Sequence, residues 1–322
     1  MTIKKAILTL ISIGIILIMT GCSGASNANG GSKNVMITTG DTGGTLYPIG
    51  ASITKIVNDK QKDIKLTNQA SGGSVENVNL LQQNDSEFAI IGGDVATDAY
   101  EGEDFFKDEP KNVSGVFAAY SQPLAILTRA DSPINSIQDI KGKSIRVGEP
   151  GSGNEVKTKK VLENLGITYD DINPQFISFS ESVDALKNNQ IDAAMFWAGS
   201  PNASIMDLST TEDIKLISLS EEERKVISSK MPYFENYSIP AGVYDGVDEE
   251  VQTLSVNAQV VASNEASEEV VYSFTKALFE NLESFNESHG AVKDLTVENA
   301  ASNTIPLHPG AEKYFKEKGI IE

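Results

Sequence analysis

Four loops built from small residues recur along the chain, and each follows a run of residues with strand character. The loops are Thr42-Gly43-Gly44, Ser71-Gly72-Gly73-Ser74, Gly151-Ser152-Gly153 and Ala198-Gly199. Glycine lets a ligand approach the backbone closely, and a helix that follows such a loop presents unpaired N–H groups and a partial positive charge. With the hydroxyls of Thr42, Ser74 and Ser152 as further donors, these loops predict a binding site for a carboxylate. The alternative interpretation is that the glycines only form turns.

Side chains near the loops could complete this site. An amino group on the ligand needs an acceptor, and Asp94 or Glu155 could supply one. Tyr47, Phe196 and Trp197 are candidates to pack on the ligand, although each of them could instead belong to the core.

Arginine usage bears on how an acidic ligand would be held. The chain contains three arginines, and Arg129 and Arg146 lie in or beside predicted strands, away from the loops. A bidentate arginine clamp on a carboxylate is therefore not expected. Neutral donors and helix termini would have to hold the acid.

The residues that enzymes of common classes need are missing. The loop from Gly148 to Gly153 is similar to a phosphate loop, but Asn154 and Glu155 stand where a lysine and a hydroxyl residue are required. His289 and His308 are the only histidines, and neither is near a second metal ligand in the sequence. We expect both to be surface or helix-capping residues, and we expect no enzyme activity, cofactor or metal. An extracellular serine hydrolase that uses a loop serine is the remaining enzymatic alternative.

The elements that must position the loops alternate between strand and helix. Strands are predicted at residues 35–39, 64–69 and 87–91, with helices at 47–59 and 75–83 between them. The same order returns with strands at 143–148, 175–178 and 192–197, a loop at 180–182, and helices at 155–165 and 183–189. Gly43 to Ser74 spans 31 positions, and so does Gly151 to Ser182. A two-fold repeat of one α/β unit is the simplest account, and a chance match is the alternative.

This repeat predicts an α/β fold with two similar lobes and a ligand cleft between them. Extended runs at 116–120, 123–128 and 254–262 would form the two crossings between the lobes. Lobe I is then expected to comprise residues 34–122 and 254–322, and lobe II residues 123–253. A helix over 267–283 with Ser267 as its N-cap, and a last helix from Pro309 to Lys318, would return to lobe I.

The first residues have the pattern of an export signal. Lys4 and Lys5 precede an apolar run over 6–19 that is too short to span a bilayer, and small residues lead to Cys22, the only cysteine. This is similar to a bacterial lipobox and predicts a signal peptide over 1–21 and a lipid-anchored, flexible tether over 22–33. The alternative is a free cysteine at the end of a transmembrane helix. The formal charge of −19 becomes −21 without the two lysines of residues 1–21, which disfavours nucleic acid as a partner.

Several longer motifs surround the loops and continue towards the end of the chain. They are Thr39-Gly-Asp-Thr-Gly-Gly-Thr-Leu-Tyr-Pro48, Ser71-Gly-Gly-Ser-Val-Glu-Asn77, Asp94-Val-Ala-Thr-Asp-Ala-Tyr100, Pro150-Gly-Ser-Gly-Asn-Glu155, Tyr169-Asp-Asp-Ile172, Ile239-Pro-Ala-Gly242 and Pro306-Leu-His-Pro-Gly310. Together they resemble the TAXI-type solute receptors of TRAP transporters over residues 35–319. The resemblance implies a type II periplasmic-binding-protein fold with two hinged lobes. It also implies a monomer that delivers glutamate, a related dicarboxylate or an amino acid to a TRAP permease driven by a sodium or proton gradient.

Carried over by position, the resemblance implies ligand contacts at three of the loops. The residues concerned are Thr42, Gly43, Gly44, Tyr47, Ser71, Ser74, Gly151, Ser152 and Gly153. Asp41 departs from the family pattern, and it would disfavour an acidic ligand if it faced the cleft. The leading hypothesis is thus an exported solute receptor, and a ligand-sensing lipoprotein of the same fold is the alternative.

Overall fold

The computed structural model describes residues 32–322, which form one compact unit. The expected signal peptide, Cys22 and nearly all of the expected tether lie outside the described residues. Within residues 32–322, no helix combines the length and apolar character that a membrane span requires.

The first α/β unit contains three parallel strands with helices between them. It comprises β1 (Lys33–Thr38), α1 (Leu46–Lys60), β2 (Ile64–Gln69), α2 (Ser74–Gln82) and β3 (Phe88–Gly92), followed by α3 (Gly93–Glu101) and the short helix η1 (Asp104–Phe106). β1 lies in the middle and pairs in parallel with both β2 and β3. Each predicted element of this unit is present, with ends that differ by two residues at most.

The second unit repeats this arrangement. It comprises η2 (Ile137–Ile140), β5 (Ser144–Arg146), α4 (Gly153–Asn164), η3 (Tyr169–Asp171), β6 (Asn173–Gln175), α5 (Phe179–Lys187) and β7 (Ala193–Trp197). β5 lies between β6 and β7 and is parallel to both, as β1 is to β2 and β3. The repeat predicted from the loop spacing is therefore confirmed by strand order. Four elements follow: α6 (Ala203–Ser209), β8 (Ile214–Ile217), α7 (Glu221–Lys230) and β9 (Glu235–Ile239).

Two long antiparallel strands join the units. β4 (Val113–Arg129) and β10 (Val251–Ser263) pair with each other in the middle of the strand order β2-β1-β3-β10-β4-β7-β5-β6. β4 pairs with β10 along its first part and with β7 over Leu124–Thr128. The two runs predicted at 116–120 and 123–128 are thus one strand, and the two predicted crossings are β4 and β10.

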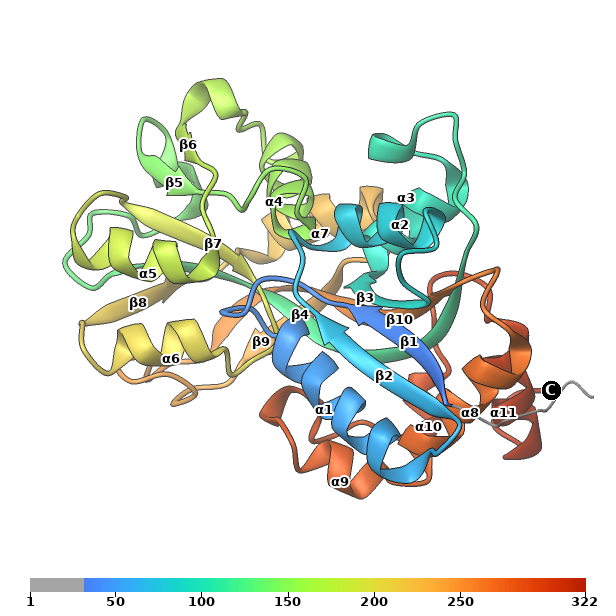
Figure 1. Ribbon diagram of the computed structural model, residues 1–322. Helices are drawn as coiled ribbons and strands as arrows, with labels where there is room; N and C mark the ends of the chain where they lie inside the picture. Colours follow the sequence, from blue (N-terminus) through green and yellow to red (C-terminus); the bar gives the residue numbers. More distant parts are fainter. Residues whose placement is uncertain (1–31) are drawn as a thin grey trace, which may run out of the picture. The chain divides into compact units, whose positions relative to one another are not determined.

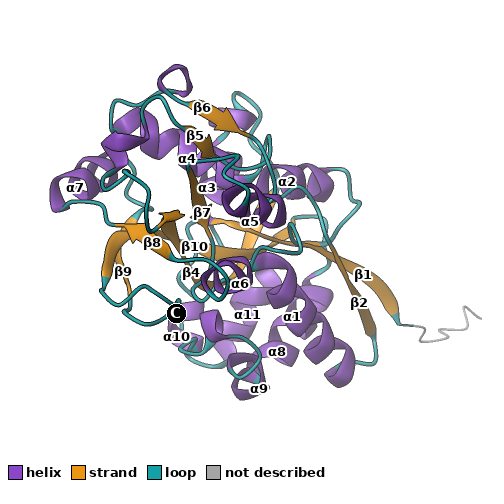
Figure 2. Ribbon diagram, turned by 90° about the vertical axis from the view of Figure 1, so that its left-hand side faces the viewer, coloured by secondary structure: helices purple, strands orange, loops and turns teal. Residues whose placement is uncertain are grey.

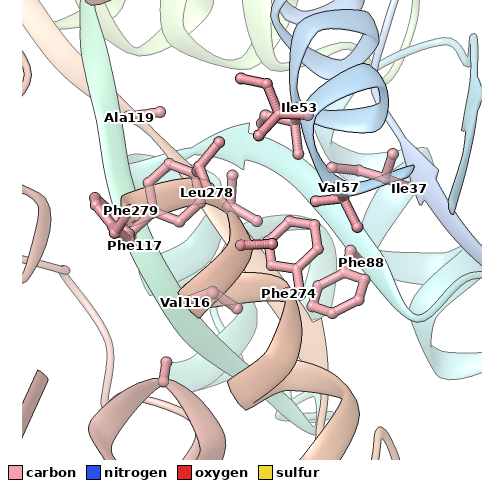
Figure 3. Packing of buried hydrophobic residues seen from close by; sticks show 14 of the residues in the cluster. Ile37, Ile53, Val57, Phe88, Val116, Phe117, Ala119, Phe274, Leu278 and Phe279 are labelled. Carbon is pink, nitrogen blue, oxygen red and sulfur yellow. The ribbon is translucent and has the colours of Figure 1, made fainter. Parts of the chain in front are cut away.

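The units have separate hydrophobic cores. We call β1–β3, α1–α3 and the C-terminal helices the first half, and β5–β9 with α4–α7 the second half. The core of the first half includes Ile53, Phe117 and the stacked rings of Phe88 and Phe274, whose centroids are 4.1 Å apart (Figure 3). In the second half, Trp197 stacks on Phe234 at 5.1 Å. Separate cores suit a two-lobed protein, but the lobe boundaries themselves stay a prediction.

The C-terminal helices pack on the first half, as expected. They are α8 (Glu268–Phe279), α9 (Leu282–Asn286), η4 (Gly290–Val292), α10 (Val297–Ala300) and α11 (Pro309–Glu317). Ser267 caps α8 by accepting a hydrogen bond from Val270 N at 3.4 Å. Figures 1 and 2 show α1 and α8 on one side of the strands of the first half and α2 and α3 on the other side.

The segment around β6 differs from the prediction. β6 ends at Gln175, and α5 begins at Phe179, so the loop predicted at residues 180–182 is the first turn of a helix. The cause is a capping box: Ser178 Oγ accepts from Glu181 N at 3.2 Å, and Glu181 Oε2 accepts from Ser178 N at 2.9 Å. Ser182 is therefore buried within α5 and is not a counterpart of Ser74.

Candidate functional site

A small cavity lies at the carboxyl ends of β1, β2, β5 and β7, where both halves contribute to it. Its volume is about 40 Å³, which is room for a few water molecules and far below the roughly 300–1,000 Å³ of typical ligand sites. The lining residues are Gly40, Asp41, Gly44, Thr45, Leu46, Gly72, Gly73, Ser74, Gln122, Arg146, Glu149, Ser152, Gly153, Asn154, Lys157, Phe179 and Trp197. A solute larger than a few waters therefore requires the halves to move apart.

Two glycines allow the halves to approach each other closely at this cavity. Gly73 has φ +112°, a conformation that favours glycine, and a Cβ built there would lie 3.4 Å from the Cβ of Ser152. A Cβ on Gly153 would lie only 2.5 Å from Ser74 Oγ. The loop before α2 thus touches the loop before α4, as expected for glycine loops on facing strand ends.

Seven of the residues predicted at the site line the cavity, namely Gly44, Gly72, Gly73, Ser74, Ser152, Gly153 and Trp197. Ser152 is the N-cap of α4, and its Oγ accepts from Glu155 N at 3.2 Å. Ser74 begins α2, and its Oγ accepts from Gly92 N at 3.1 Å. Both helices therefore start at the cavity wall, where their first N–H groups can contribute to binding an anion.

The other predicted ligand residues do not line the cavity. They are Thr42, Gly43, Tyr47, Ser71, Asp94, Gly151, Glu155, Phe196, Ala198 and Gly199. Gly43 and Gly199 instead hold the halves together through their carbonyl groups. Gly43 O accepts from Ser204 Oγ at 2.9 Å, and Gly199 O accepts from Thr45 Oγ1 at 3.4 Å.

Several of these residues have local structural contacts. Thr42 is exposed, Ala198 is part of the core of the second half, and a Cβ on Gly151 would meet open space. Ser71 Oγ donates to Asn77 Oδ1 at 2.6 Å, which orders the loop before α2. The carbonyl of Tyr47 accepts from Asn68 Nδ2 at 3.1 Å, and its half-buried ring lies outside the cavity lining.

The two carboxylates predicted to receive an amino group have partners within the protein. Asp94 is fully buried, and its Oδ1 lies 3.5 Å from Lys157 Nζ. Glu155 accepts from the hydroxyl of Tyr169 at 3.0 Å, and burial raises the pKa of its carboxyl. Lys157, and not either carboxylate, reaches the cavity wall.

Arg146 contradicts the expectation that the arginines lie away from the loops. It is the last residue of β5, it is buried, and it lines the cavity. Its Nη1 donates to Met195 O at 2.7 Å and to Asn154 Oδ1 at 3.1 Å, and its guanidinium lies 4.6 Å from the ring centroid of Phe179. Burial lowers the pKa of Arg146 to about 10, so it remains a cation at neutral pH. The prediction was wrong because the strand ends at the edge where the loops meet.

The two aromatic candidates on β7, Phe196 and Trp197, lie in different surroundings. The ring of Phe196 lies 5.0 Å from the guanidinium of Arg146 and belongs to the core. Trp197, one residue further along β7, lines the cavity. Neighbouring side chains of a strand point to opposite faces. Only one of Phe196 and Trp197 can therefore face the cavity.

Two residues that line the cavity each have a buried polar atom without a hydrogen-bond partner in residues 32–322. The atoms are the indole Nε1 of Trp197, a donor in a residue that is 1% exposed, and Oε1 of Gln122, an acceptor in a residue that is 3% exposed. A buried donor or acceptor without a partner costs about 1–3 kcal/mol. A solute that brings both an acceptor and a donor would remove this cost.

The lining contains two basic and two acidic side chains. Arg146 and Lys157 are basic, and Asp41 and Glu149 are acidic. Burial lowers the pKa of Lys157. Asp41 Oδ1 accepts from Gly43 N at 2.6 Å. Burial, followed by the nearby charge of Asp41, raises the pKa of Glu149. A balanced lining suits a zwitterion better than a ligand with two negative charges.

The two histidines are helix caps, as predicted. His289 Nδ1 accepts from Ala291 N at 3.0 Å at the start of η4, and His308 Nδ1 accepts from Gly310 N at 3.1 Å at the start of α11. Within residues 32–322, no group of three or more His, Cys, Asp or Glu side chains is placed to hold a metal ion.

Sequence reasoning missed several lining residues, of which Gln122 and Lys157 are the most informative. Gln122 follows Ser121 between two apolar runs of β4, and a buried amide at such a position is a usable signal. Lys157 lies four residues after Gly153, on the first turns of α4. Helical side chains lean towards the N-terminus, so this lysine reaches back to the loop.

Residues 37–319 match the model of the NMT1-like family. The chain belongs to that family. Among solved structures, it is similar to the alkanesulfonate-binding protein SsuA from Xanthomonas axonopodis pv. citri bound to MOPS, with 14% identity over 88% of this chain and 83% of that chain and a TM-score of 0.50. A Listeria monocytogenes protein assigned as an L-cystine ABC transporter is 12% identical over 81% and 97% of the chains, with a TM-score of 0.51. A Xanthomonas citri protein bound to ATP is 11% identical over 90% and 97%, with a TM-score of 0.52.

These similarities extend over most of each chain and confirm the predicted fold class, a mixed α/β fold of periplasmic-binding-protein type II. Two of the similar structures are named as a binding protein and a transporter.

Proposed function

We propose that this protein is an extracytoplasmic receptor that binds a small solute between its two halves and delivers it to a membrane transporter. The observation that carries the proposal is that two residues lining the cavity, Trp197 and Gln122, each have a buried polar atom without a hydrogen-bond partner in residues 32–322. Such an atom needs an explanation, and a solute that supplies the partner is the one we propose. Membership of the NMT1-like family and the type II fold support this function.

The lining favours a small amino acid, with L-glutamate as the first candidate. A carboxylate would meet the N-termini of α2 and α4, the indole N–H of Trp197 and the ammonium of Lys157. An ammonium group would meet Oε1 of Gln122 and the carboxylates of Asp41 and Glu149. The carboxylate of Asp41 would thus repel a simple dicarboxylate and attract the ammonium group of a zwitterion.

The proposed transporter is a TRAP-type permease, because the motifs around the cavity loops resemble TAXI-type receptors. We also propose that Cys22 carries a lipid that retains the receptor at the outer face of the cell membrane. A TRAP permease encoded beside this chain would support the partner. Mass spectrometry of the protein from its native membrane would detect the lipid on Cys22, and an unmodified, full-length chain would contradict the anchor.

Titration calorimetry tests the ligand. The full chain with Cys22→Ser is titrated with L-glutamate, L-glutamine, succinate and glutarate. We expect the two amino acids to bind more tightly than the two dicarboxylates, because only the amino acids supply an ammonium group to Asp41, Gln122 and Glu149. Tighter binding of the dicarboxylates would contradict the zwitterion, and absence of binding by all four would contradict the ligand class.

A further inference from the structure

Four charged side chains join α3 of the first half to α4 of the second half. Lys160 Nζ lies 2.6 Å from Asp98 Oδ2, and Lys157 Nζ lies 3.5 Å from Asp94 Oδ1. The aspartates are four residues apart on α3 and the lysines three apart on α4, so each pair of like residues shares one helix face. We call Asp94, Asp98, Lys157 and Lys160 the α3–α4 strap.

The strap exists only while the halves are together. Val156 of α4 is packed in an apolar cluster with Val75 and Val95 of α2 and α3, directly beside the strap. The side chains of Asp94 and Lys157 are 0% and 2% exposed. Moving the halves apart would break both ion pairs and expose this apolar contact to water, so the strap and the cluster favour the closed arrangement.

The lysines of the two ion pairs differ in how many polar groups they contact. Lys160 contacts Asp98, Asp104 Oδ2 at 3.3 Å and the hydroxyl of Tyr233 at 3.4 Å. Lys157 has one long contact, with Asp94, among the described residues, although an ammonium group has three donors. Asp94 Oδ2 has no hydrogen-bond partner in the part of the chain that the structure describes. The less satisfied pair is the one that borders the cavity, because Lys157 is part of its lining.

An anionic group of a bound solute would give Lys157 its missing acceptor. We propose that the α3–α4 strap holds the two halves closed, and that Lys157 is a positioning residue that ties this closure to an anionic group of the solute. The second part rests on the proposed receptor function. In the closed form, Lys157 then binds Asp94 of the first half and the solute at the same time, so the solute strengthens a contact between the halves.

Distance measurement between spin labels tests the strap without a ligand. The full chain with Cys22→Ser carries introduced cysteines at Lys55 on α1 and Asp184 on α5, which are exposed positions in different halves. We expect one short distance in the parent protein and an added population at longer distance in the Asp94→Asn/Asp98→Asn variant. Lys313→Met is the matched control, because it removes an ion pair with Glu268 that lies within the first half.

The outcomes of this measurement are distinct. Identical distance distributions for the parent and the strap variant, with and without L-glutamate, would overturn the strap. A strap variant that fails to fold is recognised by its thermal unfolding, and Lys160→Gln, on the more exposed pair, then replaces it in the same measurement.

L-Glutamate binding tests the role of Lys157. We expect Lys157→Gln to weaken binding about tenfold or more, the effect of losing a hydrogen bond from a charged group, and we expect L-glutamate to leave the longer-distance population of this variant unchanged. Lys160→Gln, which removes a strap residue outside the cavity lining, should weaken binding less, and L-glutamate should return its longer-distance population to the short distance. Equal effects of the two variants would overturn the role of Lys157. If the parent binds L-glutamine but not L-glutamate, the same measurements are made with L-glutamine. If it binds none of the four solutes, the ligand class fails and the role of Lys157 with it, while the ligand-free distances still decide the strap.

Discussion

At the scale of single residues, Trp197 and Gln122 set the chemistry of the cavity. Each lines the cavity and has one buried polar atom without a hydrogen-bond partner in the described part of the chain. Trp197 ends the apolar strand β7, and Gln122 follows Ser121 between two apolar runs of β4. Under the proposed function, the solute would supply the partners of these two atoms.

Replacing Trp197 by phenylalanine should separate binding from folding. The change removes the Nε1–H donor but keeps a ring that can stack on Phe234. We expect about tenfold weaker binding of L-glutamate and a melting temperature close to that of the parent, measured by calorimetry and thermal unfolding. Tyr272→Phe, which removes a surface hydroxyl bonded to Glu317, is the control. Unchanged affinity of the Trp197→Phe variant would contradict the assigned role.

Gln122→Leu should have opposite effects on stability and on binding. Removing a buried acceptor that has no partner relieves its desolvation cost, so the ligand-free protein should be more stable by about 1 kcal/mol. Binding of L-glutamate should become weaker, because the ammonium group loses an acceptor. Urea denaturation and calorimetry measure the two quantities, and a loss of stability without a loss of affinity would show that the amide is structural.

At the scale of elements, the caps of the helices decide which residues reach the site. The prediction of a loop over residues 180–182 came from aligning the two repeats. It failed because Ser178 and Glu181 form a capping box that begins α5 at Phe179. Arg146 was misjudged for a related reason, since β5 ends at this residue rather than two residues later. Element order could be predicted from periodicity and glycine spacing, whereas the ends of elements depend on single hydrogen bonds, and the ends determine what faces the cavity.

The cap of α11 predicts a dependence of stability on pH. His308 Nδ1 accepts from Gly310 N, so Nε2 carries the proton and donates to Ala266 O at 3.1 Å. Burial lowers the pKa of His308, while in the unfolded chain it is about 6.5. The neutral side chain therefore contributes stability above pH about 6.5, and this contribution is lost as the pH falls and the unfolded state takes up the proton.

His308→Asn should reduce this pH dependence, because asparagine can cap the helix but does not titrate. We expect the free energy of unfolding to fall less between pH 8 and pH 5 in the variant than in the parent, measured by urea denaturation. Contributions from other titrating groups cancel in the comparison. An equal fall in both proteins would contradict the role of His308.

At the scale of the whole molecule, the two halves meet around a cavity of about 40 Å³. The fold class and the two-fold repeat could be predicted from sequence, because both follow from local patterns. The set of lining residues could be predicted only in part, since it depends on contacts between residues more than 100 positions apart, such as Gly43 with Ser204. The sequence around a loop does not indicate which residues of the other half the loop contacts.

A disulfide between the halves should control entry of the solute. A Cβ built on Gly43 would lie 2.9 Å from Ser204 Oγ, so the Gly43→Cys/Ser204→Cys pair is close enough to link once the backbone adjusts slightly. In a Cys22→Ser background, we expect the oxidised protein to bind no L-glutamate and the reduced protein to bind it, as measured by calorimetry. Binding by the fully oxidised protein at the parent rate would show that the solute enters without separation of the halves.

The pairing of β4 with β10 also restricts how the halves can move. The two strands pair from Val113 to Pro123 on β4, with register shifts next to Ala258 and Val261 of β10. Sliding one half past the other would break many of these ladder bonds at once, whereas bending the ribbon across its flat face spreads small dihedral changes over several residues. If the halves separate as proposed, we therefore expect a rotation about an axis that crosses the ribbon. One angle describes such a motion, and a single distance between the halves is sufficient to follow it.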